Sequence, residues 1–66
     1  MKEFRLDYIS KRRKELGYTL ENMANILGIT GSPTYLRYER GVYKFKAEMV
    51  PRLASALKCK IDDLFA

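Results

Sequence analysis

Apolar residues recur at the three- and four-residue spacing of helices along most of this chain, and no segment alternates as a strand does. Read at 3.6 residues per turn, this spacing predicts five short helices. They cover about residues 5–15, 19–27, 33–40, 51–58 and 61–65. We therefore expect an all-α fold.

Residues that favour helix ends stand at most of the predicted boundaries. Thr19 is placed to cap the second helix and Ser32 to cap the third. Pro33 then occupies a first helical position, where its missing N–H costs nothing. Glycines, which tolerate the backbone of a helix end, follow the first three helices. They are Gly17, Gly28 and Gly41.

The 33–40 helix has two different faces. Tyr35 and Tyr38 point to one side, and we expect them to pack against the rest of the domain. The opposite side, an arc of about 100°, holds one proline, one leucine and two arginines. They are Pro33, Leu36, Arg37 and Arg40. A helix anchored by tyrosines in this way would present its arginines to a polyanion.

The net charge is +5, and the excess lies in the first two thirds of the chain. Residues 1–46 hold ten Lys and Arg against five Asp and Glu, whereas residues 47–66 hold three of each. This asymmetry favours a surface that meets an anion, although lysines and arginines that merely solvate helices would give the same count.

Length and composition exclude several classes of protein. Sixty-six residues, 47% of them apolar, fit one small globular domain, and no apolar run approaches the roughly 20 residues that span a bilayer. The N-terminal MKEFRLDYIS carries charges where a signal peptide needs apolar residues.

Cys59 is the only cysteine. We therefore expect no disulfide, no metal cluster, a small buried thiol and a reducing, cytoplasmic setting.

The chain also lacks the residue combinations of a catalytic centre. It has no histidine. It offers no paired nucleophile and base, no metal-ligand spacing and no glycine-rich phosphate loop. We expect no enzymatic activity, no cofactor and no small-molecule ligand.

Three stretches, TLENMANILGIT, TYLRYERG and PRLASALKCKIDDLF, resemble in order the helix-turn-helix domains of the lambdoid phage repressor and Cro (XRE-like) family. The resemblance covers about residues 5–66 and implies one compact five-helix DNA-binding domain over residues 1–66. Its second helix, about 19–27, and its recognition helix, about 33–40, would form the helix-turn-helix. The family implies a transcription regulator, most simply a repressor of phage or mobile-element origin that binds an operator in double-stranded DNA as a homodimer.

The resemblance assigns base reading in the major groove to four residues of the recognition helix. They are Ser32, Pro33, Leu36 and Arg37. Arg37 is the strongest candidate, because a guanidinium matches the O6 and N7 atoms of guanine bidentately. Leu36 is placed either against a thymine methyl group or in the core.

Phosphate contacts are expected from the turn before the second helix and from the loop after the third. The candidates are Thr19, Arg40, Tyr43, Lys44 and Lys46. In the family an arginine of the first helix pairs with the glutamate of the ERG-like motif, which corresponds here to Arg13 and Glu39. Arg13 could also turn toward a phosphate, and the alternative is that the two charges are solvated separately.

The C-terminal residues are candidates for a dimer interface. Ile61, Leu64 and Phe65 could meet a second copy or seal the core of the monomer. The chain is accordingly either a complete small regulator or the N-terminal domain of a longer repressor.

Two features depart from the family pattern and favour an alternative function. Leu20 stands where members often carry a glutamine that holds a phosphate, and the turn GITGSP is one residue longer than usual. Leu20, Pro33 and Leu36 could together form an apolar patch. The alternative is a protein-interaction module, of antitoxin or antirepressor type, on a helix-turn-helix scaffold.

Overall fold

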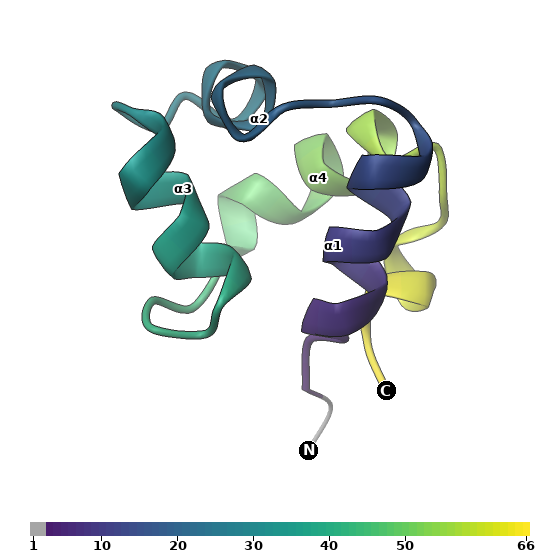
Figure 1. Cartoon of the computed structure of the whole chain (residues 1–66). Helices are drawn as coiled ribbons and strands as arrows, with labels where there is room; N and C mark the ends of the chain where they lie inside the picture. The colour runs from purple at the N-terminus through teal and green to yellow at the C-terminus, as the bar shows by residue number, and fades with distance from the viewer. Residues whose placement is uncertain (1–2) are drawn as a thin grey trace.

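Residues 3–66 of the chain are described by a computed structural model, in which helices follow one another with short connections (Figure 1). The α-helices are α1 (Leu6–Glu15), α2 (Leu20–Leu27), α3 (Ser32–Glu39) and α4 (Val50–Ala56). Two 3₁₀ helices complete the described part, η1 (Ala47–Met49) and η2 (Ile61–Leu64). Met1 and Lys2, which begin the expected domain and the charged N-terminal stretch, lie outside the described residues.

The all-α class is confirmed, but two of the expected helices differ in kind or extent. The fifth is the 3₁₀ helix η2, and it ends at Leu64 because Phe65 adopts extended backbone and pairs with Phe4 in an isolated antiparallel bridge. The side chain of Asp63 accepts a hydrogen bond of 3.0 Å from the backbone N–H of Lys60 and fixes the start of this turn. The fourth helix begins at Val50, one residue before Pro51, and directly follows η1.

The cap of α2 is as predicted, whereas that of α3 is not. The Thr19 hydroxyl accepts a hydrogen bond from the Asn22 N–H, and the Asn22 side chain accepts one from the Thr19 N–H, both at 3.0 Å. Ser32 is instead the first residue of α3, and Gly31 stands at the cap without a side-chain hydrogen bond. Gly31 has a φ of 85°, a left-handed conformation that favours glycine.

Side chains from all four α-helices, from η2 and from the loop after α3 form the core. The buried apolar residues are Ile9, Met23, Ala24, Leu27, Tyr35, Tyr38, Phe45, Val50, Leu53, Ala54, Leu57 and Leu64. Tyr35 and Tyr38 therefore pack as predicted. Phe45 lies in the loop after α3 and is buried, with its ring centroid 5.4 Å from those of both Phe4 and Tyr38.

The two ends of the described chain lie side by side (Figure 1). The N–H of Arg5 donates to the carbonyl of Leu64 at 2.7 Å, and the rings of Phe4 and Phe65 are 4.6 Å apart. Leu64 is fully buried, so of the two roles left open for it, its side chain takes that of sealing the core. Phe65 is half-buried and packs on Phe4, whereas Ile61 is 45% exposed.

Within residues 3–66, no helix is both long and apolar enough to pass through a bilayer. The same residues hold no group of three or more His, Cys, Asp or Glu side chains that could bind a metal ion. Cys59 is a free thiol and is half-buried.

Candidate nucleic-acid interface

Helices α2 and α3 are joined by a short turn, and α3 lies at one side of the molecule (Figure 1). Tyr35 and Tyr38 hold the inner face of α3 in the core. Pro33, Arg37 and Arg40 are exposed on its outer face, as the helical spacing predicts. The sequence of α3 thus separates anchoring aromatic side chains from exposed cationic ones.

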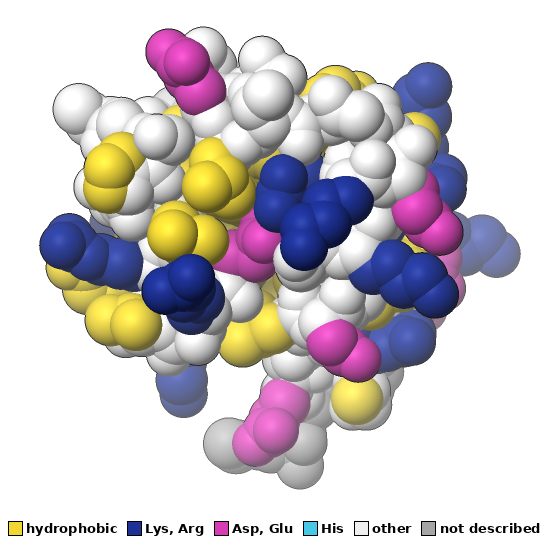
Figure 2. Space-filling view, in the orientation of Figure 1, with side chains coloured by type: hydrophobic (Ala, Val, Ile, Leu, Met, Phe, Trp, Pro, Cys, Tyr) yellow, Lys and Arg dark blue, Asp and Glu magenta, His cyan; other side chains and the backbone are white. Residues whose placement is uncertain are grey.

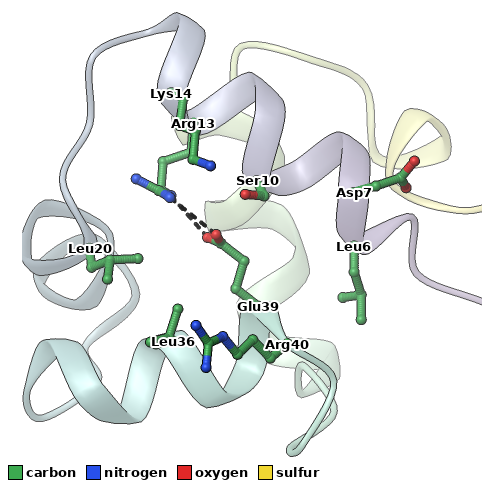
Figure 3. Close-up of a pocket in the computed structure, with 9 residues that line it drawn as sticks. All are labelled: Leu6, Asp7, Ser10, Arg13, Lys14, Leu20, Leu36, Glu39 and Arg40. Carbon is green, nitrogen blue, oxygen red and sulfur yellow. Dashed lines mark hydrogen bonds and ion pairs between the residues drawn. The ribbon is translucent and has the colours of Figure 1, made fainter.

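Arg13 of α1 and Glu39 of α3 form a bidentate ion pair (Figure 3). The Arg13 Nε donates to Glu39 Oε2 at 3.0 Å, and Nη2 donates to Oε1 at 3.2 Å. The third nitrogen, Nη1, donates to the backbone carbonyl of Tyr18 at 2.9 Å. One guanidinium therefore connects α1, α3 and the segment that leads into α2.

This pairing leaves Arg13 little exposed surface for a phosphate contact. All three guanidinium nitrogens donate within the chain, and only 10% of the side chain is exposed. The structural pair is thus present, and a contact of Arg13 with a phosphate stays a prediction. Burial by itself would raise the pKa of Glu39, but the hydrogen bonds and positive charge of Arg13 outweigh it and hold this pKa below its ordinary value.

Tyr35 lies against the same pair from the core side. Its ring is fully buried, and its hydroxyl has no hydrogen-bond partner among the described residues. Burial, and to a smaller extent the neighbouring carboxylate of Glu39, raises the pKa of Tyr35 far above its ordinary range. Tyr35 is consequently neutral and inaccessible, which makes it an anchor of α3 and excludes it as a stacking platform.

A hollow of about 350 Å³ opens beside the ion pair, between α1, the start of α2 and α3 (Figure 3). It is lined by Leu6, Asp7, Ser10, Arg13, Lys14, Leu20, Leu36, Glu39 and Arg40. Three half-buried leucines reach it from three different helices, and the exposed cations Lys14 and Arg40 stand beside them. Leu36 is thus neither fully in the core nor fully exposed.

Figure 2 shows the same side of the molecule as Figure 1, with hydrophobic side chains lying between Lys and Arg groups and one acidic group in their midst. The remaining expected phosphate contacts are accessible. Thr19 is exposed at the start of α2, and Lys44 and Lys46 are exposed in the loop after α3. Tyr43 in that loop is 44% exposed, with its ring edge-on to Tyr38 at 5.4 Å. Ser32 is half-buried.

Five lining residues of the hollow were not among the predicted site residues: Leu6, Asp7, Ser10, Lys14 and Leu20. Lys14 belongs to a run of cations on α1 that resembles ordinary helix solvation. Its neighbour Arg12 turns away and donates from Nε to the carbonyl of Leu57 at 2.9 Å, so the run does not act as one patch. Leu20 departs from the family pattern and was predicted to form an apolar patch with Pro33 and Leu36; it lines the hollow together with Leu36, whereas Pro33 does not.

Comparison of the sequence with known protein families gives a match. A sequence model of the family described as Helix-turn-helix matches residues 9–64, which is most of the chain. Neither the curated proteins nor the solved structures contain a match to this sequence.

Proposed function

This chain belongs to the Helix-turn-helix family of DNA-binding transcription regulators, of the repressor and Cro type, and from that premise we propose that it is a sequence-specific repressor. Its α3 enters the major groove of an operator. Two copies occupy half-sites about one helical turn apart and block transcription by occupancy.

The observation that carries the proposal is the division of α3 into two faces. Tyr35 and Tyr38 are buried, and Glu39 is held by Arg13, so the inner face is fixed to the domain. The exposed guanidinium groups of Arg37 and Arg40 are left on the outer face. A rigid helix with free guanidinium groups suits a groove lined by phosphates and base edges.

Individual roles follow from exposure and chemistry. Arg37 reads a guanine, with Ser32 and Pro33 at the start of α3 against neighbouring base edges. Arg40, Lys44 and Lys46 contact phosphates, and so does the Tyr43 hydroxyl.

Thr19 contacts a phosphate at the other end of the interface. Its hydroxyl oxygen already accepts the bond from Asn22, so its proton remains free to donate to a phosphate oxygen. The N–H groups of the first turn of α2 lack carbonyl partners within the helix and support the same anion.

A second copy meets the surface around Ile61, whose side chain is 45% exposed. Phe65 contributes only the part of its ring that Phe4 leaves uncovered. Dimerisation through this surface leaves α3 free to enter DNA.

In vitro selection of bound oligonucleotides from a random duplex pool tests the proposal. We expect a palindromic site whose half-sites lie about 10 base pairs apart, and an affinity that falls steeply with salt. Recovery of no enriched sequence, together with salt-independent association, would overturn it.

The hollow favours one second candidate, a protein-interaction module. Leu6, Leu20 and Leu36 offer a partner an apolar surface where a phosphate contact is usual for this family. Electrophoresis with random-sequence duplex at low salt separates the candidates, since a protein module that has lost DNA binding gives no shift at micromolar concentration.

A further inference from the structure

The hollow between α1, α2 and α3 has an apolar wall made of Leu20 and Leu36. We propose that this wall receives the 5-methyl group of a pyrimidine, so that the chain selects thymine or 5-methylcytosine at one position of each half-site. The proposal rests on the DNA-binding function proposed above and names the chemical group that this part of the surface recognises.

The two leucines are placed to form one contact surface although they are 16 positions apart in the sequence. Leu20 is the first residue of α2, and Leu36 lies in the middle of α3. In Figure 3 the Leu20 side chain points from α2 across the hollow, and the Leu36 side chain rises from α3 toward the same space. Both are half-buried, so each keeps apolar surface that a ligand group can cover.

The charges around the hollow are unsuited to a phosphate in its interior. The Arg13 guanidinium donates hydrogen bonds to the Glu39 carboxylate and to the Tyr18 carbonyl. The lining also includes the carboxylates of Asp7 and Glu39. A phosphate is therefore drawn to the exposed cations Lys14 and Arg40, while the space beside the leucines favours an uncharged, apolar group.

DNA offers one such group in the major groove. Of the base-edge groups exposed there, the C5-methyl is the apolar one, and the other edges present hydrogen-bond donors and acceptors. Leu36 directly precedes Arg37 and lies one turn before Arg40 on the same face of α3. A helix that docks its arginines on guanine and phosphate brings Leu36 to the edge of a nearby base pair.

Removal of single methyl groups from the DNA tests the proposal. In the duplex obtained by in vitro selection, each thymine is replaced in turn by uracil, which removes only the methyl group. We expect one thymine in each half-site at which uracil weakens binding about fourfold, the factor that corresponds to about 0.8 kcal/mol for burying a group of this size. Placing 5-methylcytosine in place of cytosine at that position should recover a similar factor.

Variants of the protein assign the effect to the wall. Leu36→Ala and Leu20→Ala should each reduce the thymine-to-uracil ratio at this position toward one. Because the ratio compares two duplexes with the same protein, a partly unfolded variant does not distort it. Val42→Ala removes a side chain that is 65% exposed and does not line the hollow, and it should keep the full ratio.

The outcomes separate this inference from the function on which it rests. If the wild-type chain binds the selected duplex and uracil has no effect at any position, the methyl receptor is refuted while the regulator stands. The same conclusion follows if both leucine variants keep the full ratio. If no duplex is selected or bound at all, the DNA-binding function itself fails.

Discussion

Arg13 and Glu39 are 26 positions apart in the sequence, and two hydrogen bonds of 3.0 and 3.2 Å join their side chains across the interface of α1 and α3. Glu39 lies one turn beyond Tyr35 on α3, so the ion pair and the buried ring hold the same face of this helix against the domain. Arg37 and Arg40 lie on the opposite, exposed side of the same helix.

Removal of one partner should be much more damaging than removal of both. Glu39→Leu leaves the buried Arg13 cation without its carboxylate, and we expect a loss of about 3–5 kcal/mol in the free energy of unfolding. A core of this size supplies about that much stability in total, so the variant should be largely unfolded at 25 °C. The measurement is urea unfolding followed by circular dichroism.

The double variant Arg13→Met/Glu39→Leu is the matched control. It replaces the pair by apolar side chains of similar size, and we expect its stability within about 1 kcal/mol of wild type, since such replacements are often neutral. A double variant as unstable as Glu39→Leu alone would show that the pair itself, rather than the isolated charge, governs folding.

Acid should weaken the domain through the same carboxylate. The pKa of Glu39 in the folded chain lies below its ordinary value of about 4.5, because burial, which raises it, is outweighed by the groups around the carboxylate, with the hydrogen bonds of Arg13 foremost. The ionised pair therefore contributes its full stability above about pH 4.5, and the contribution is lost as the pH falls through the lowered pKa. Between pH 7 and pH 5 we expect no change from this group.

Comparison with the double variant isolates this effect from other carboxylates. Urea unfolding at pH 7 and pH 3 should show that the wild type loses more stability than Arg13→Met/Glu39→Leu does. Equal losses in the two proteins would mean that the pKa of Glu39 is not lowered by folding.

Features set by neighbours in the sequence could be predicted, and features set by tertiary packing were the ones missed. The Thr19 cap needs only Asn22, three residues away, and it is present as predicted. The cap expected at Ser32 failed because the conformation of the preceding turn decides it. Phe45 is an isolated apolar residue in a polar loop, so no periodicity could reveal that Phe4, Tyr35 and Tyr38 surround it.

The same distinction applies to the candidate site. The two faces of α3 follow from helical spacing alone, and exposed Arg37 and Arg40 lie where they were expected. The pairing of Arg13 with Glu39 was expected from the family resemblance and left open by the residues themselves. The approach of Leu20 to Leu36 depends on the angle between α2 and α3, which neither spacing nor composition determines.

Two substitutions at Thr19 separate its structural role from its proposed contact with DNA. Thr19→Asp keeps a good capping group and adds a negative charge at the positive end of α2, so we expect unfolding stability close to wild type. The same charge repels a phosphate, and DNA affinity should fall about tenfold or more at low salt.

Thr19→Ala gives the complementary result. It removes the hydroxyl that accepts from Asn22 and should cost about 1 kcal/mol of stability. Its DNA affinity should fall less than that of Thr19→Asp. If Thr19→Asp binds DNA as the wild type does, then α2 does not approach a phosphate at this end.

Arg37 and Lys44 are both exposed cations, and the proposed function predicts that their substitution affects DNA binding in different ways. Arg37→Ala removes a bidentate base contact, so binding of the selected site should weaken by about 1–3 kcal/mol while one base position loses its preference. Lys44→Ala removes a phosphate contact, so it should weaken selected and random duplexes alike and lower the slope of log K against log salt by about one. Lys58→Ala removes an equal charge from the exposed turn after α4 and serves as the control, with both slope and preference unchanged. Fluorescence anisotropy over a salt series, on the selected duplex and on duplexes altered at single positions, measures all three. Equal losses on selected and random DNA for Arg37→Ala would place this side chain on the backbone and remove it from base reading.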